Sequence, residues 1–126
     1  MKRFNYAKGQ IGEEAAAEFL RKKGYQILER NFRTKFGEID IIAREKQEEP
    51  FLPKIVFVEV KTKSGEEFGE PWEMVNKRKV GQVRRMAELY LMFKRLGEAA
   101  CRIDVVGVWL DILGEVERIE HWEDVQ

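Results

Sequence analysis

The sequence predicts an α/β fold in the order helix, three strands, helix and one or two strands, built around a mixed central sheet that helices flank. Three observations predict this fold. Residues 55–61 are β-branched and aromatic up to a charged end, which is typical of a strand buried on both faces. Apolar residues recur at helical spacing over residues 6–23 and 76–96. Residues 102–110 alternate in polarity as a strand does.

The first helix is expected over residues 6–23, where an apolar stripe lies opposite a charged one, and Gly24 is expected to end it. Gly9 and Gly12 lie early in this helix, where each glycine costs about 1 kcal/mol relative to alanine. Two interpretations are open: a neighbouring chain segment or ligand approaches closely there, or the first turn is frayed.

Three strands with short connections follow, over residues 25–32, 38–43 and 55–61. Their order favours an antiparallel meander. Regular alternation would put Glu38, Asp40 and Ile42 on one face of the second strand. Glu59 and Lys61 would likewise share one face at the end of the third.

The second half of the chain is expected to complete the sheet. Asn76 is a suitable N-cap for a helix that ends at Gly97. If the strand over 102–110 runs parallel to the one over 55–61, this helix is the crossover between them. Residues 115–122 carry the charges of an exposed edge strand.

Length and composition narrow the class of protein. The chain has 126 residues and a formal net charge of zero, so we expect one domain over 1–126 that does not coat nucleic acid through bulk charge. Cys101 is the single cysteine, which fits a reducing compartment and excludes a Cys-x-x-Cys metal site. No secretory signal or membrane-spanning stretch is visible. A cytoplasmic protein with no membrane partner is expected.

The charged residues at the strand ends are the candidates for chemistry. If the second and third strands pair, Asp40 and Glu59 come together, and two carboxylates with the carbonyl of Val60 offer the oxygen ligands that suit Mg²⁺ or Mn²⁺. Lys61 could then orient an attacking water and offset charge on a phosphorane-like transition state. A structural ion pair between Glu59 and Lys61 is the alternative.

Two other residues are interpreted as structural. His121, the single histidine, lies in a charged C-terminal segment and is expected at the surface rather than in a metal site. Glu38 could belong to the site beside Asp40, but we favour a role in closing the turn at Gly37.

A set of short motifs spans nearly the whole chain: Gly12, Glu13 and Ala16; 24–25, 27–28 and 30–33; 37–40 and 42–43; 57–61; 68–69 and Pro71; Lys79, Ala87 and 90–91; and 102–105. In this combination the chain resembles the YraN-like family of small bacterial proteins, which are described as endonuclease-like. The order Asp, then Glu-x-Lys on a strand, also resembles the PD-(D/E)xK nucleases and their restriction-endonuclease-like α-β-β-β-α-β core.

The resemblance implies a metal-dependent phosphodiesterase site at Asp40, Glu59 and Lys61. The family is similar to archaeal Holliday junction resolvases, which add an acidic residue from the first helix. The matching residue here is Glu13, for which a solvated helix glutamate is the alternative. These similarities imply a hydrolase of DNA repair or recombination.

Basic residues are segregated from acidic ones along the chain, as in a nucleic-acid-binding face. One basic group lies at the start of the second helix, another over 21–35, and an acidic stretch over 115–124. The individual phosphate contacts expected are Lys79 and Arg102, joined by Lys77 and Arg84. The alternative is that these side chains only solvate helix faces. Phe68 and Trp72 could stack on a base, although a core role is favoured.

These patterns together predict a Mg²⁺- or Mn²⁺-dependent DNA endonuclease, resolvase-like and specific for structure rather than sequence, because no sequence-reading module is visible. Branched or single-stranded DNA is the expected substrate, and resolving a junction would require a homodimer with two sites. One alternative is a non-catalytic nucleic-acid-binding protein that retains the fold. Another is a protein-interaction module that uses the acidic tail or Phe51 and Leu52.

Overall fold

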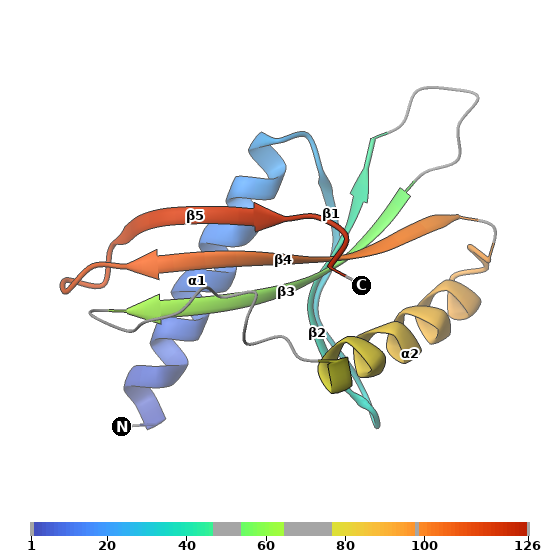
Figure 1. Ribbon diagram of the computed structural model, residues 1–126, viewed down its shortest axis with the longest axis horizontal. Helices are drawn as coiled ribbons and strands as arrows, with labels where there is room; N and C mark the ends of the chain where they lie inside the picture. The colour runs from blue at the N-terminus through green and yellow to red at the C-terminus, as the bar shows by residue number, and fades with distance from the viewer. Residues whose placement is uncertain (1, 47–53, 65–76, 98, 126) are drawn as a thin grey trace.

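A computed structural model of the chain describes residues 2–46, 54–64, 77–97 and 99–125. Its elements are α1 (Lys2–Lys22), β1 (Gln26–Thr34), β2 (Gly37–Glu45), β3 (Lys54–Ser64), α2 (Lys77–Phe93), β4 (Ala100–Leu110) and β5 (Val116–Trp122). This order confirms the predicted α-β-β-β-α-β core and adds β5 (Figure 1). Five residues given roles above lie outside the described residues: Phe51, Leu52, Phe68, Trp72 and Asn76.

The strands form one five-stranded mixed sheet in the order β1-β2-β3-β4-β5. The first three strands form the expected antiparallel meander. β3 and β4 are parallel from Lys54 paired with Ala100 to Ser64 paired with Leu110, so α2 is part of the crossover that joins them. β5 pairs antiparallel with β4 and lies at the edge, as predicted.

Each helix covers one face of this sheet (Figure 1). Successive residues of β3 divide between two hydrophobic clusters, because side chains alternate across a strand. The α1 core contains Val56 and Val58 with Ala16, Leu20 and Ile41. The α2 core contains Ile55 and Phe57 with Ile39, Met86 and Tyr90. The apolar run of β3 is therefore covered on both sides, as its composition indicates.

The two helices end in similar ways at different kinds of residue. Gly24, at φ 95°, ends α1 with the Gly24 N–H bonded to the Arg21 carbonyl and the Tyr25 N–H to that of Leu20. In α2 the left-handed position is taken by Arg95, at φ 56°, rather than by Gly97 as predicted. Within the described segments, neither helix has the length and apolarity needed to cross a membrane.

Candidate active site

The candidate site lies where β2 and β3 separate. Their pairing runs from Glu45 and Lys54 to Ile41 and Val58. One residue further, the carboxylate of Asp40 accepts a hydrogen bond from the backbone N–H of Val60 at 2.8 Å. A side chain thus replaces the backbone partner that regular pairing would supply, and it holds Asp40 against the backbone of the Glu-x-Lys strand.

The alternation of side chains in β2 breaks at Asp40. Ile41 packs in the α1 core, whereas Ile39 and Ile42 both pack in the α2 core. Residues 39 and 41 would share a face in a regular strand. The prediction that Glu38, Asp40 and Ile42 share one face is therefore wrong, since the strand rolls over at Asp40 and leaves Glu38 and Ile42 on opposite sides.

β1 breaks at the matching position, Asn31, which has a left-handed backbone with φ 53°. On one side of it, Arg30 reaches Glu14 of α1, with 2.7 Å between Nη1 and Oε2. On the other side, Phe32 packs edge-to-face on Tyr90 of α2, with ring centroids 5.3 Å apart. Side-chain alternation is therefore interrupted at neighbouring positions of both strands, Asn31 and Asp40, beside the carboxylates of the site.

Glu59 is the most deeply buried carboxylate of the site, with only 3% of its side chain exposed. Its Oε2 lies 3.7 Å from Nζ of Lys79 on α2. Its Oε1 is buried without a hydrogen-bond partner among the residues that the structure describes. Burial, followed by the negative charge of Asp40, raises the pKa of Glu59 from 4.5 to about 7, although Lys79 and Lys61 act against this rise.

Asp40 is linked electrostatically to the rest of the site. Burial raises its pKa, while the bond from the Val60 N–H lowers it. The charge of Glu38 raises it further, and the charges of Lys61 and Lys79 lower it. The ammonium of Lys61 therefore lies within electrostatic reach of both Asp40 and Glu59, as the predicted arrangement of Asp and Glu-x-Lys requires.

Gly12 brings α1 close to β3 beside this cluster. A Cβ at Gly12 would lie 1.8 Å from Oγ1 of Thr62, which confirms close approach of the chain at this glycine. The same interpretation is wrong for Gly9, where a Cβ would meet nothing within 4 Å. The close packing at Gly12 therefore fixes how near the next residue, Glu13, lies to the sheet.

Glu13 and Asp40 line a cleft of about 260 Å³ together with Lys8, Gly9, Val60 and Thr62. Burial raises the pKa of Glu13, and the charges of Asp40 and Glu38 raise it further. Asp40 therefore interacts electrostatically with both Glu13 on α1 and Glu59 on β3. The structure brings together all four residues proposed for catalysis, and it adds Lys79 and Glu38 to their surroundings.

This donor set fits a hard divalent cation. The charge of Asp40 raises the pKa of both Glu13 and Glu59, and one buried carboxylate oxygen lacks a hydrogen-bond donor within the described part of the chain. A Mg²⁺ or Mn²⁺ ion would offset the repulsion between the carboxylates and coordinate the oxygen that has no donor, because it supplies positive charge and prefers oxygen ligands. Asp40, Glu59 and the carbonyl of Val60 are the residues that would hold it.

Arg102 belongs to a different cluster. Its guanidinium bonds the buried Asp104 through Nε at 2.9 Å, Glu45 through Nη1 at 2.6 Å and the Tyr25 hydroxyl through Nη2 at 2.6 Å. Only 11% of its side chain is exposed. This placement argues against the predicted phosphate contact, because the guanidinium already satisfies several buried or half-buried acceptors of the protein itself.

His121 lies in the same cluster as Arg102. Its side chain is 2% exposed, with Nε2 2.7 Å from Asp104 and Nδ1 2.8 Å from Nζ of Lys23. The prediction of a surface histidine is wrong, because β5 folds back on β4 and pairs His121 with Val106. Among the described residues, Asp104, His121 and Glu123 are the one trio with ligand atoms within 4.8 Å of one another. Arg102 already supplies the positive charge there.

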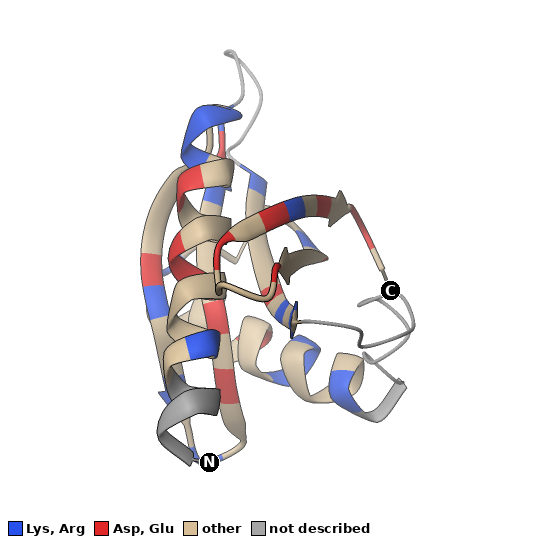
Figure 2. Cartoon of the chain, turned by 90° about the vertical axis from the view of Figure 1, so that its left-hand side faces the viewer, with Lys and Arg blue, Asp and Glu red and all other residues tan. Residues whose placement is uncertain are grey.

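Three of the four basic residues proposed for phosphate binding lie on α2, and Arg102 lies apart from them on β4. Lys79 lies at the site against Glu59, Arg84 is exposed on α2, and the side chain of Lys77 lies outside the described part. Figure 2 shows basic residues at the C-terminal end of α1 and on α2, with acidic residues along the middle of α1. Arg33 pairs with Glu38 at 3.5 Å, so the basic group over 21–35 is mixed with acids.

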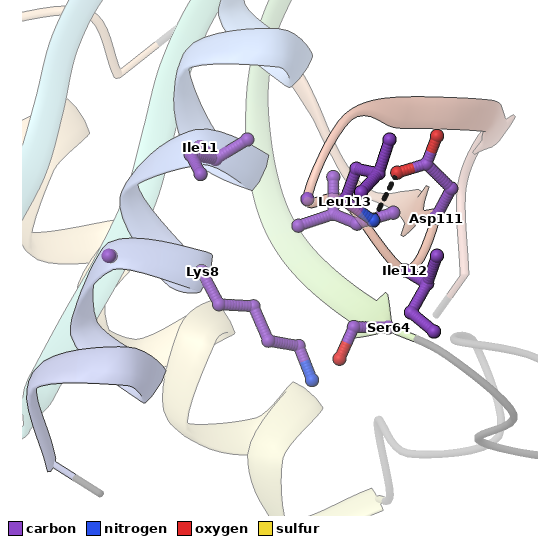
Figure 3. Close-up of a pocket in the computed structure, with 9 residues that line it drawn as sticks. Lys8, Ile11, Ser64, Asp111, Ile112 and Leu113 are labelled. Carbon is purple, nitrogen blue, oxygen red and sulfur yellow. Dashed lines mark hydrogen bonds between the residues drawn. The ribbon is translucent and has the colours of Figure 1, made fainter.

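A second hollow of about 380 Å³ lies between α1 and the turn that joins β4 to β5 (Figure 3). Its walls are largely aliphatic, and Ile112 and Leu113 on the turn are 93% and 81% exposed. Oδ1 of Asp111 accepts the backbone N–H of Leu113 at 2.9 Å and braces the turn. Lys8 lines both this hollow and the carboxylate cleft.

Sequence reasoning missed Asn31. With its amide nitrogen facing the acids, Asn31 donates to Oε2 of Glu13 at 3.2 Å and to Oε1 of Glu38 at 2.8 Å. One signal was present in the sequence: asparagine is depleted in strands, yet Asn31 stands between Arg30 and Phe32 in one.

Comparison with known proteins agrees with the set of short motifs that spans nearly the whole sequence. A family model described as "Uncharacterised protein family UPF0102" matches residues 12–108. A UPF0102 protein of Moorella thermoacetica is 49% identical over 113 residues, covering 90% of this chain and 89% of the relative. One from Desulforamulus reducens is 41% identical over 116 residues, covering 91% of each. The matched range includes Glu13, Asp40, Glu59 and Lys61, and the chain therefore belongs to the UPF0102 family.

Proposed function

We propose that this protein is a Mg²⁺- or Mn²⁺-dependent nuclease of the PD-(D/E)xK type that hydrolyses phosphodiester bonds in DNA. The observation that carries the proposal is the pair formed by the half-buried Asp40 and the buried Glu59, held together with Lys61 and Lys79 where β2 and β3 separate. Buried acids of this kind are costly to the fold unless they are used. Oε1 of Glu59 has no hydrogen-bond partner among the residues that the structure describes, which supports use by a cation.

Each residue has a distinct role in this proposal. Asp40 and Glu59 would hold the ion, and the bond from the Val60 N–H fixes Asp40 for that task. A bound ion would supply the positive charge that a phosphodiester needs on its developing anionic oxygens. Lys61 would orient the attacking water, and Lys79 would leave Glu59 to contact a phosphate oxygen. Glu13 would add a carboxylate from the α1 side.

The substrate proposed is branched or single-stranded DNA. The fold carries no recognisable sequence-reading element within the described residues, so recognition would depend on backbone shape and charge. Arg84 on α2 lies on the same helix as Lys79 and could extend the phosphate contacts. Resolution of a four-way junction would additionally require two copies of the chain.

The test is cleavage of branched, flapped, single-stranded and duplex DNA, and of matching RNA, with Mg²⁺ or Mn²⁺. We expect Asp40→Asn, Glu59→Gln and Lys61→Ala each to lose about 100-fold or more in rate, as expected for groups that act on transition-state charge. Glu18→Gln, an exposed change on the outer side of α1, is the matched control and should cleave normally.

Calorimetry with Mn²⁺ separates the proposal from its main rival. We expect binding by the wild-type protein and its loss in Glu59→Gln. Cleavage that is unchanged in Glu59→Gln and Lys61→Ala would refute the assignment. DNA binding with neither Mn²⁺ binding nor cleavage would instead identify a non-catalytic nucleic-acid-binding protein that retains the fold.

A further inference from the structure

Asn31 occupies a position that links both sides of the candidate site. Its amide nitrogen reaches Glu13 on α1 at 3.2 Å and Glu38 on β2 at 2.8 Å. The charges of Asp40 and Glu38 raise the pKa of Glu13, and the charge of Glu38 also raises that of Asp40, so the three carboxylates lie within electrostatic reach of one another. A single amide group therefore lies between a helix and a strand that both contribute acids.

The backbone of Asn31 is shaped for this contact. Its φ of 53° is left-handed, a conformation that asparagine tolerates better than other non-glycine residues. The roll-over at Asn31 places Arg30 and Phe32 on opposite faces of the sheet. In a regular strand those two would share a face, and the side chain between them would point to the other. The left-handed turn is what aims the amide at Glu13.

We propose that Asn31 is a positioning residue, which holds the Glu13 carboxylate over Asp40 by hydrogen bonds to Glu13 and Glu38. The consequence for activity rests on the proposed nuclease function. An amide is suited to this task because it donates two hydrogen bonds and carries no charge. It orients two acids and leaves their negative charge available to a cation. A lysine or arginine in its place would orient them and also neutralise them.

The test is a matched set of variants. Asn31→Gly removes the amide and accepts the left-handed backbone, so its unfolding free energy should not fall as that of an alanine variant would. We expect Mn²⁺ affinity to fall about tenfold or more, the effect typical of groups that orient metal ligands. Arg95→Gly is the control, because Arg95 is also left-handed, at φ 56°, but lies beyond the C-terminal end of α2.

A double-mutant cycle distinguishes positioning from general stabilisation. If Asn31 acts through Glu13, Asn31→Gly should change Mn²⁺ affinity less than about twofold in a Glu13→Gln background. Equal losses in the two backgrounds, or wild-type affinity in Asn31→Gly alone, would overturn the proposal.

An NMR measurement keeps this test independent of nuclease activity. The side-chain amide resonance of Asn31 should shift in Glu13→Gln and remain in place in Glu18→Gln, in the absence of any metal. No shift in Glu13→Gln would overturn the contact itself. If the wild-type protein neither binds Mn²⁺ nor cleaves DNA, the proposed function fails, and the amide resonance alone then decides whether Asn31 holds Glu13.

Discussion

Two clusters of acidic residues lie on the same sheet, and their negative charge is compensated to different degrees. In the Arg102 cluster, a guanidinium stands among Glu45, Asp104 and Glu123 and bonds all three. In the Asp40 cluster, the charge of Asp40 raises the pKa of both Glu13 and Glu59, and Nζ of Lys79 lies 3.7 Å from Oε2 of Glu59. The first cluster contains its own counter-charge, and the second is only partly compensated.

The pKa directions record this difference. Burial alone would raise the pKa of Asp104, yet hydrogen bonds from His121, Arg102 and the Asp124 N–H lower it overall. Burial also raises the pKa of Glu59, and there the neighbouring acid adds to the rise. The pKa values of these two buried carboxylates therefore shift in opposite directions because their neighbours differ in charge. From this comparison we infer that the fully paired acidic cluster stabilises the fold, whereas the partly compensated one is the better candidate for binding a cation.

Removing the guanidinium should produce the largest effect. Arg102→Ala leaves Asp104, which has no exposed surface, without its charged partner. We expect the unfolding free energy to fall by about 3–5 kcal/mol, the range for breaking a buried pair. Urea denaturation measures it. Arg118→Ala, an exposed arginine stacked on Trp109, is the control and should cost far less. A small effect of Arg102→Ala would show that the two clusters are not energetically distinct.

Neutralising Glu59 should increase the unfolding free energy, whereas removing the Arg102 guanidinium should decrease it. Because its pKa is about 7 in the folded protein and 4.5 in the unfolded chain, the folded state binds more protons between these values. Stability therefore falls as pH rises from about 4.5 to about 7 and stays reduced above that. In EDTA at pH 8, Glu59→Gln should gain on the order of 2–3 kcal/mol over the wild type.

That gain should vanish as the pH falls well below 4.5, where Glu59 is protonated in both states. Denaturation curves of both proteins across this range measure it. Glu18→Gln, on the exposed side of α1, should show no such dependence. Equal stability of the Glu59→Gln and wild-type proteins at pH 8 would mean that the Asp40 cluster is compensated after all.

Adding one methyl group at Gly12 should disturb the Asp40 cluster from the helix side. The new Cβ would lie 1.8 Å from Oγ1 of Thr62, so α1 must move away from β3. We expect a loss of about 1–3 kcal/mol in unfolding free energy, as for overpacking, together with weaker Mn²⁺ binding as Glu13 is displaced.

Gly9→Ala is the matched control for that change. It lies one helical turn earlier, with nothing within 4 Å of its Cβ position, and should gain up to about 1 kcal/mol from helix propensity. Thermal or urea unfolding compares the two. Destabilisation of both variants to the same degree would contradict the assigned contact.

The smallest effect is expected within the Arg102 cluster. Tyr25→Phe removes the hydroxyl that accepts from Arg102 at 2.6 Å. Since the guanidinium retains Asp104 and Glu45, we expect a loss of only about 1 kcal/mol by urea denaturation. Tyr90→Phe, in the α2 core, serves as the control. A loss as large as that of Arg102→Ala would mean that the hydroxyl, and not the charge, holds this cluster together.

Much of the fold could be predicted from local patterns. The apolar run of β3, the stripes of the helices and the glycine after α1 each reflect forces that act within a few residues. Glu59 and Lys61 could be chosen as candidates for the same reason, because charges at the end of an apolar strand are conspicuous, and the expected pairing of the two strands added Asp40. The buried contacts of Arg102 could not be predicted, because its partners Glu45, Tyr25 and Glu123 come from distant parts of the chain.

The sequence by itself determined the order of elements, the two-sided burial of β3 and the shared face of Glu59 and Lys61. Only the tertiary structure decided which acids carry their own counter-charge. It also decided where β1 and β2 roll over, at Asn31 and Asp40, and so which acids meet. The physical reason is that charge compensation depends on contacts between residues far apart in sequence, whereas helix and strand formation depends on neighbours along the chain.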